Sequence, residues 1–166
     1  MDELIFNQKK IPKKQWRYGL RSSAATGCGW IAVYNALQLM GLRTRPEALI
    51  RWFTRDVPLL NGNAGTMIFS PMRCLRRMGF RVRAVLRPSR FDGAAKEADV
   101  CLLYYRWRHK WKCGAHFVAL QYRNGAFWGY NTYTNSTGPD YYGDSLEGYL
   151  RRERYRIPVL FSVHRK

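Results

Sequence analysis

The spacing of apolar residues changes near Gly79, and this change limits the fold class more than any other feature of the sequence. Before it, apolar residues recur at helical intervals in three segments, at 28–40, from 46 onward and at 70–79, with a loop predicted at 61–66. After it, strand patterns occur at 80–86, 99–105, 115–122, 126–133 and 157–163, with a short helix at 91–98. Helices followed by strands predict an α+β fold, with N-terminal helices packed on an antiparallel β-sheet.

The chain has 166 residues without an internal repeat, a low-complexity tract or a flexible linker, so we expect one domain spanning 1–166. Its four cysteines are too few and too scattered for a disulfide framework. The N-terminus lacks the apolar core of a signal peptide, and no apolar run approaches the ~20 residues of a membrane helix. We therefore expect reduced thiols, a cytoplasmic location and no membrane span.

The balance of charge is strongly basic. Lys and Arg number 29 against 11 Asp and Glu, for a formal net charge of +18, and the excess runs along the whole chain. Such a field favours anionic partners, including nucleic acid, lipid headgroups and acidic peptides. Residues 106–112 (Arg-Trp-Arg-His-Lys-Trp-Lys) alternate cations with aromatic rings. This stretch matches a patch that binds nucleic acid or an anionic membrane, and it also matches a solvated loop between two strands.

Cys28 stands in the first turn of the most apolar predicted helix, directly after Gly27. The free N–H groups and the dipole of a helix N-terminus stabilise a thiolate, which predicts a lowered pKa for Cys28 and a nucleophile at neutral pH. The same N–H groups are suited to holding an oxyanion during acyl transfer. The alternative interpretation is a small buried apolar residue.

Asn124-Gly125 predicts a two-residue hairpin turn between the strands 115–122 and 126–133. That turn sets Val118 opposite Asn131, so His116 and Asn131 become diagonal neighbours on one face, roughly 7–8 Å apart. An amide that accepts from one imidazole nitrogen fixes the tautomer and leaves the other nitrogen as a base toward a thiol. The alternative is that His116 is an ordinary core histidine and Asn131 only ends a strand.

Three short stretches carry a resemblance to a known family: Gly-Cys-Gly-Trp opening a helix at Cys28, Ala-His-Phe around His116, and Asn131. Together they resemble a papain-fold cysteine peptidase, and the helix sequence is similar to small bacterial peptidases related to bacteriocin-leader-processing enzymes. The resemblance implies Cys28 as nucleophile, His116 as general base and Asn131 as the residue that orients the imidazole. It also implies cleavage of a peptide or isopeptide bond in a peptide or protein substrate through an acyl-enzyme.

Two positions depart from the leader-processing enzymes. Those enzymes place a Gln shortly before the nucleophile to build the oxyanion hole, where this chain has Ser22. Gln15 is the candidate for that role if the segment between them folds back. The third catalytic member is usually Asp in those enzymes, whereas this chain has Asn131, as papain does. The alternative function is a basic binding module on the same fold, with a vestigial catalytic set, that binds nucleic acid or another anionic partner. Acyl transfer in place of hydrolysis is a third possibility, because the same triad serves both reactions.

Cys113 and His116, with Cys101 upstream, raise the question of a zinc site. Their spacing fits none of the usual paired-ligand patterns. Residues 113 and 116 also point to opposite faces of a strand. We therefore expect neither a metal site nor a cofactor. His109 is a second candidate base, but no orienting side chain follows it at a useful spacing.

Overall fold

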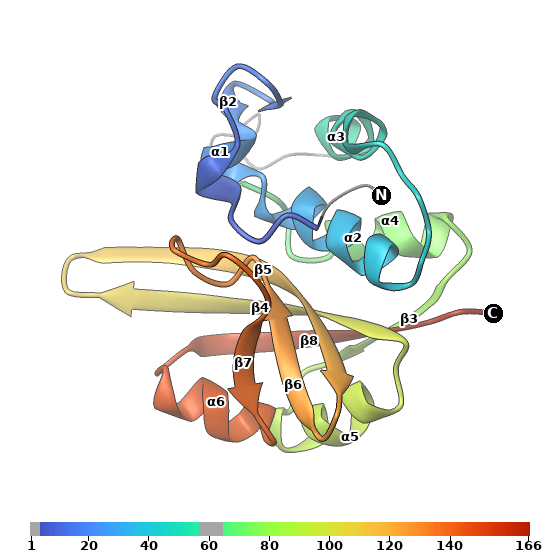
Figure 1. Cartoon of the computed structure of the whole chain (residues 1–166), viewed down its shortest axis with the longest axis vertical. Coiled ribbons are helices and arrows are strands. Elements are labelled where there is room, and N and C mark those ends of the chain that lie inside the picture. Colours follow the sequence, from blue (N-terminus) through green and yellow to red (C-terminus); the bar gives the residue numbers. More distant parts are fainter. Residues whose placement is uncertain (1–3, 57–64) are drawn as a thin grey trace.

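The computed structural model describes residues 4–56 and 65–166 and has the expected α+β architecture, with helices packed on an antiparallel sheet (Figure 1). The helices are η1 (Gln8–Lys10), α1 (Ser23–Thr26), α2 (Cys28–Leu39), α3 (Pro46–Arg55), α4 (Ser70–Arg77), η3 (Pro88–Arg90), α5 (Phe91–Lys96) and α6 (Leu146–Arg152). The strands are β1 (Arg17–Tyr18), β2 (Arg21–Ser22), β3 (Arg81–Val85), β4 (Val100–His109), β5 (Lys112–Arg123), β6 (Ala126–Tyr130), β7 (Asp140–Gly143) and β8 (Arg156–His164).

The main sheet has the strand order β3-β8-β4-β5-β6-β7, and every neighbouring pair is antiparallel. Helices α2, α3 and α4 cover one face, and α5 and α6 cover the other (Figure 1). The pair β1 and β2 forms a separate small ribbon beside α1. None of the helices in the described ranges has the length and apolar composition needed to cross a bilayer.

Helix α2 confirms the helix predicted at 28–40. It is buried along almost its entire length, from Gly29 to Leu37, because apolar side chains occupy nearly all of its faces. It packs on β5 and β4 on one side and against α3 and α4 on the other. The indole of Trp30 donates a hydrogen bond to the hydroxyl of Ser23 (3.1 Å), which ties α2 to α1. The start of this central helix is therefore held firmly against the sheet.

The strands at the centre of the sheet are apolar on both sides because both faces are covered. Leu102 and Phe117 face the core under α2, whereas Leu103 and Val118, their neighbours in sequence, face the core under α5 and α6. This explains why the apolar run at 99–105 predicted a buried strand.

The β5–β6 hairpin has the predicted turn and register. Asn124 and Gly125 both have positive φ (51° and 79°), as a type I′ turn requires, and Ala119 pairs with Tyr130. The ladder ends there because Asn131 adopts φ 67° and turns the chain away. Strand β6 is accordingly shorter than the predicted 126–133, and the expected pairing of Val118 with Asn131 does not form.

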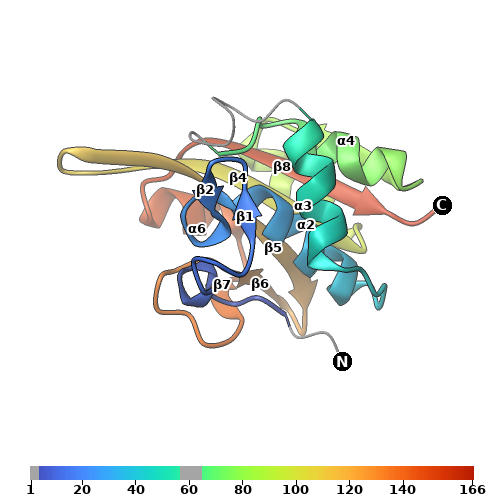
Figure 2. The ribbon, with the colours of Figure 1, turned by 90° about the horizontal axis from the view of Figure 1, so that it is seen from above.

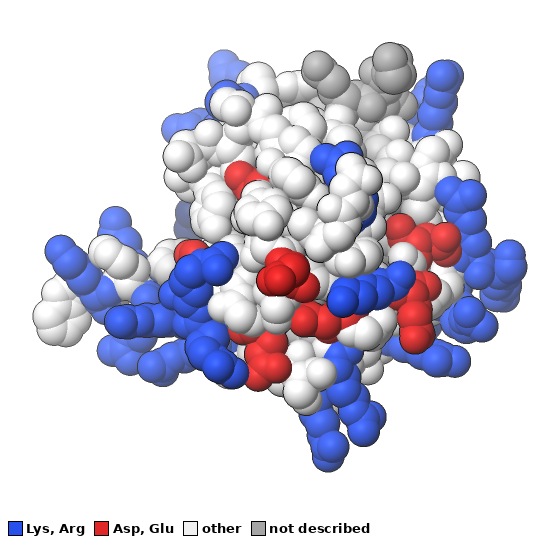
Figure 3. Space-filling view, turned by 60° about the horizontal axis from the view of Figure 1, so that its bottom comes forward, with Lys and Arg blue, Asp and Glu red and all other residues white. Residues whose placement is uncertain are grey.

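Residues 106–112 are not a solvated loop between two strands. They extend β4 and β5 into a two-stranded ribbon that pairs as far as His109 opposite Lys112, around a tight turn at Lys110 and Trp111. Figures 1 and 2 show this β4–β5 ribbon projecting beyond the rest of the sheet. Lys and Arg side chains gather around the projecting end in Figure 3. The alternation of cations and rings suits a ribbon with two wet faces.

Four other predicted elements are present close to their predicted positions, namely α3, α4, α5 and β3, and β8 matches the last predicted strand. The loop predicted at 61–66 lies largely outside the described residues, which resume at Gly65. Strand β7 and the short elements that precede α2, namely η1, β1, β2 and α1, have no counterpart among the predicted elements. These last elements lie beside the candidate site.

Candidate active site

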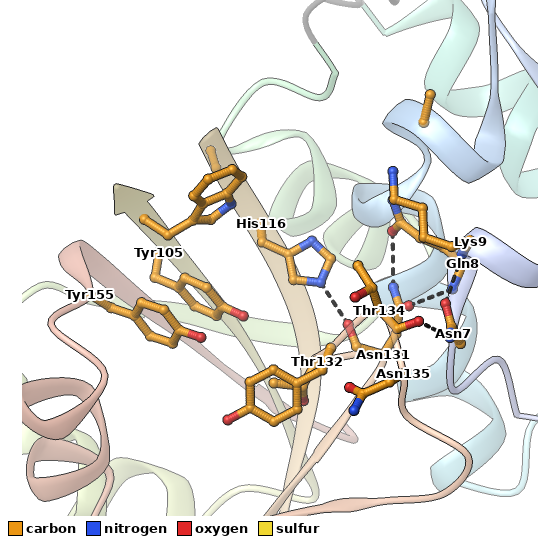
Figure 4. A pocket seen from close by; sticks show the side chains of 14 residues that line it. Asn7, Gln8, Lys9, Tyr105, His116, Asn131, Thr132, Thr134, Asn135 and Tyr155 are labelled. Carbon is orange, nitrogen blue, oxygen red and sulfur yellow. Dashed lines mark hydrogen bonds between the residues drawn. The ribbon is translucent and has the colours of Figure 1, made fainter. Parts of the chain in front are cut away.

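His116 lies on β5 just beyond the point where β6 leaves the sheet. Its Nε2 is 2.6 Å from the backbone carbonyl oxygen of Asn131 (Figure 4). A carbonyl oxygen only accepts hydrogen bonds, so Nε2 carries the proton and Nδ1 of the neutral ring carries none. Burial lowers the pKa of His116, and the carbonyl bond opposes that shift only in part. The hydrogen bond to Asn131 therefore fixes the tautomer of the neutral ring, and burial disfavours its protonation.

The side chain of Asn131 is used differently from what the sequence suggested. Its amide oxygen accepts from the backbone N–H of Gln8 (2.8 Å), and its Nδ2 donates to the side-chain oxygen of Gln8 (3.1 Å). The backbone carbonyl of Asn131, not its amide, thus contacts the imidazole. Asn131 has a positive φ, which Asn tolerates better than most residue types. The residue with this backbone conformation is also the one whose carbonyl contacts His116.

Gln8 is placed by contacts that link the N-terminal segment to the loop after β6. The amide of Asn7 donates to the carbonyl of Thr134 (2.6 Å) and accepts from the backbone N–H of Lys9 (2.9 Å). The side-chain nitrogen of Gln8 donates to the carbonyl of Ala24 in α1 (3.4 Å). The buried Gln8 therefore bridges α1 and Asn131.

Cys28 is the first residue of α2 and is half-buried. Burial raises the pKa of its thiol. Hydrogen bonds from the backbone at Phe117, Gly29 and Cys28 itself, together with the charge of Lys9, act in the opposite direction but are smaller. The lowered pKa predicted from the helix N-terminus is therefore wrong, because loss of hydration outweighs the N–H groups. The contact with Phe117 brings the sulfur next to the residue that follows His116.

A cavity of about 460 Å³ has His116 on its wall, and Cys28 is not among the residues that line it. Tyr105, Trp107 and Tyr155 form an aromatic side, and the amides, threonines and one lysine of the lining lie across from it (Figure 4). The lining residues are Asn7, Gln8, Lys9, Ala25, Tyr105, Trp107, Ala115, His116, Asn131, Thr132, Tyr133, Thr134, Asn135 and Tyr155. The lining contains a cation and no carboxylate, so it suits a neutral or anionic ligand.

The aromatic side of the cavity is held in place by packing. The ring of Tyr105 meets His116 edge to face, with centroids 5.9 Å apart, and stacks on Tyr155 at 3.9 Å. Trp107 lies across Gly114 on the opposite strand, where a Cβ would come within 2.6 Å of the indole. Gly114 thus provides the space in which the indole sits.

The structure separates the other candidates from this cavity. Gln15 is exposed in a turn, where its N–H bonds to the carbonyl of Pro12, and it does not line the cavity. His109 is exposed near the end of the β4–β5 ribbon. Cys113 is exposed on that ribbon, whereas Cys101 is buried in the core under α5 and α6. Among the described residues, no group of three His, Cys, Asp or Glu side chains is arranged to hold a metal ion.

Sequence reasoning missed Gln8 and Tyr155. Gln8 contacts Asn131 across 123 residues of sequence, and Tyr155 precedes a strand to which no chemistry was attached. The only signal for Gln8 was its residue type, because the chain also offers other glutamines upstream and downstream of Cys28.

Comparison with solved structures identifies the fold. The peptidase domain of Streptococcus ComA, a bi-functional ABC transporter involved in a quorum-sensing pathway, matches with a TM-score of 0.58 at 10% identity, over 86% of this chain and 93% of that domain. A double glycine motif protease from an AMS/PCAT transporter, in complex with its leader peptide, matches with a TM-score of 0.56 at 11% identity, over 95% and 96% of the two chains. No family model matches the sequence, and the search of curated proteins gives no match. The chain has the papain-like fold of these peptidase domains, as the sequence resemblance predicted.

Proposed function

We propose that this chain is a cysteine peptidase that cleaves a peptide or isopeptide bond with Cys28 as nucleophile and His116 as general base. The observation that carries the proposal is the hydrogen bond from Nε2 of His116 to the carbonyl of Asn131, on the wall of the cavity. The backbone of the next residue, Phe117, contacts Cys28 at the start of α2. The fold of known peptidase domains supports the same reaction class. The complex of one of them with a leader peptide supports a peptide substrate.

In the proposed reaction, Nδ1 of His116 removes the proton from the Cys28 thiol while the sulfur attacks the substrate carbonyl. The Asn131 carbonyl, as acceptor for Nε2, stabilises the imidazolium that forms. The N–H groups of Cys28 and Gly29, at the start of α2, hold the oxyanion. His116 then returns its proton to the leaving amine, the C–N bond breaks, and water hydrolyses the thioester with His116 again acting as base.

The two pKa shifts favour general-base activation over a resting thiolate–imidazolium pair. Burial raises the pKa of Cys28 and lowers that of His116, so burial favours the neutral form of both groups before substrate binds. The exposed Lys9 at the rim acts on both groups, since its charge lowers the pKa of each. Proton transfer therefore accompanies the attack on the carbonyl.

The test is hydrolysis of a library of internally quenched peptides by the full chain and by its Cys28→Ala and His116→Ala variants. We expect turnover that either substitution abolishes and a thioester adduct on Cys28 detectable by mass spectrometry after rapid acid quenching. Wild-type protein that forms no adduct with any peptide would contradict the proposal. Circular dichroism on each variant separates loss of chemistry from loss of folding.

A second candidate is the basic binding module with a vestigial catalytic set, and the cations of the β4–β5 ribbon favour it. Its test is the salt dependence of binding to heparin and to a single-stranded oligonucleotide. Binding that persists above physiological salt supports a dedicated anion site, whereas binding that disappears near physiological salt reflects the overall charge alone.

A further inference from the structure

Strand β5 has an edge that leads to the cavity and that no strand of the described ranges covers. β5 pairs with β4 as far as Lys112, but its pairing with β6 begins only at Ala119. On the side away from β4, residues 112–118 therefore have no strand partner in residues 4–56 and 65–166. Cys113, Ala115 and Phe117 present their backbone groups to that side, and the N–H of Phe117 is already bonded to Cys28. The backbone bond of Phe117 to Cys28 marks the side on which alternate N–H groups point. An unpaired edge of this kind is a template for an added strand.

The side chains beside this edge are cationic. Arg106 lies opposite Ala115, and Arg108 lies opposite Cys113. Because Ala115 and Cys113 are short, the guanidinium groups on β4 are open to a ligand that runs along β5. Lys112 is exposed on the other face of the ribbon. No Asp or Glu occurs between Asp99 and Asp140, and the ion pairs found in the described ranges all lie elsewhere.

The same edge is continuous with the proposed active site. Ala115 and His116 both line the cavity, and Trp107, which rests on Gly114, connects the ribbon to the aromatic wall. A chain that extends along β5 from Lys112 therefore arrives directly at the imidazole. The cations of the ribbon and the exposed Trp111 at its tip would also suit a lipid surface or a nucleic acid. The continuity of the edge with the cavity favours a segment of the substrate, because neither of those partners needs to reach His116.

We propose that the free edge of β5 binds an extended, acidic segment of the peptide substrate as an added β-strand, with carboxylates of one face of that strand on Arg106 and Arg108. This inference rests on the proposed peptidase function, because it assigns the segment that flanks the scissile bond. Backbone hydrogen bonds along the edge supply affinity for any extended chain, and the cations select acidic side chains from it.

Binding is tested apart from turnover, with the full chain carrying Cys28→Ala. The probe is a fluorescein-labelled Glu-Val-Glu-Val-Glu-Val-Glu peptide, and its counterpart with Gln in place of Glu is the control, both measured by fluorescence anisotropy at physiological salt. We expect the Gln peptide to bind about tenfold more weakly, in line with the loss of several exposed charge pairs. Equal affinity for the two peptides overturns the acidic preference.

The matched variants are Arg106→Gln/Arg108→Gln on the ribbon and Arg81→Gln/Arg83→Gln on β3, where both arginines are exposed at the opposite edge of the sheet. Both double variants remove the same charge. We expect the ribbon variant to weaken binding of the Glu peptide about tenfold and the β3 variant less than twofold. Equal losses would mean that the overall field attracts the peptide, and the proposal would be wrong.

Strand addition is tested with two further Glu peptides in which alternate amides are N-methylated in one register or the other. Only one register points its N–H groups at β5, so we expect one peptide to lose binding and the other to retain it. Retention by both peptides overturns strand addition.

The competing occupants are tested with phosphatidylserine-containing vesicles and a poly-dT oligonucleotide. If Arg106→Gln/Arg108→Gln abolishes binding to either and leaves peptide affinity unchanged, the surface belongs to that partner and the proposal is overturned. Failure of the peptidase proposal gives a different result. In that case the Glu peptide still binds, but the protein that retains Cys28 does not hydrolyse any peptide.

Discussion

The imidazole of His116 is oriented by the main chain of Asn131, through a 2.6 Å contact between Nε2 and the carbonyl oxygen. The side chain of Asn131 is engaged by Gln8 instead. The third member of the proposed catalytic set is therefore a backbone group whose position depends on the left-handed conformation of one residue and on the N-terminal segment that clamps it.

Asn131→Gly separates the backbone role of this residue from a side-chain role. Glycine adopts φ 67° without strain and retains the carbonyl, but it removes the amide that pairs with Gln8. We expect kcat/KM in peptide hydrolysis to fall by about tenfold, because the two hydrogen bonds between the amide and Gln8 that hold this carbonyl in position are lost. A fall comparable to that of His116→Ala would show that the amide itself orients the imidazole.

Gln8→Ala and Gln15→Ala form a matched pair. Removal of the Gln8 side chain leaves Nδ2 of the buried Asn131 without its acceptor, so we expect the free energy of unfolding to fall by about 1–3 kcal/mol, together with peptidase activity. Gln15 is exposed, and its substitution should change stability by less than about 0.5 kcal/mol. Urea unfolding and peptide hydrolysis measure both effects. Loss of activity in Gln15→Ala at unchanged stability would restore Gln15 as an oxyanion donor.

The pKa shifts predict how Cys28 reacts with iodoacetamide. Because burial raises the pKa of the thiol, alkylation of Cys28 should follow a midpoint on the alkaline side of an ordinary cysteine. His116→Ala should barely move this midpoint, although it should abolish peptide turnover, since the neutral imidazole acts only during the reaction. Mass spectrometry maps the rate at each of the four thiols. Fast alkylation at acidic pH that depends on His116 would establish a resting ion pair instead.

The lowered pKa of His116 predicts how the free energy of unfolding depends on pH. Because the pKa of His116 is lower in the folded protein than in an unfolded chain, the unfolded state binds a proton first as pH falls. The neutral ring therefore favours the folded state above the ordinary imidazole pKa, and this advantage is lost as pH falls toward the lowered value. We expect urea midpoints to fall below neutral pH by less in His116→Gln than in the wild type. Identical pH dependences in the two proteins would contradict the lowered pKa.

The fold was predictable because each of its main elements has a local pattern. The buried helix from Cys28, the apolar run at 99–105 and the Asn124-Gly125 turn each depend on neighbouring residues alone, and all three are present. The β4–β5 ribbon was missed because alternating cations and rings carry no core face by which a strand is recognised.

The candidate site was only half predictable, for a physical reason. The hairpin register brought His116 near Asn131, but the choice between carbonyl and amide depends on Gln8, a residue 123 positions away. The sign of the Cys28 shift depends on how much of the sheet and of the N-terminal segment covers the thiol. Neither the group of Asn131 that contacts His116 nor the burial of the Cys28 thiol can be predicted from the residues adjacent in sequence.

Gly114→Ala tests whether the packing of the Trp107 indole on Gly114 determines the shape of the cavity. A Cβ at this position would lie 2.6 Å from the indole, so the ring must move off the ribbon and the aromatic wall changes. We expect KM for a peptide substrate to rise severalfold with a smaller change in kcat, a destabilisation of about 1–3 kcal/mol, and an altered near-ultraviolet circular dichroism spectrum. Trp107→Ala removes the clash, so Gly114→Ala added to it should have little further effect on KM or stability. Additive effects of the two substitutions would show that the glycine acts independently of the indole.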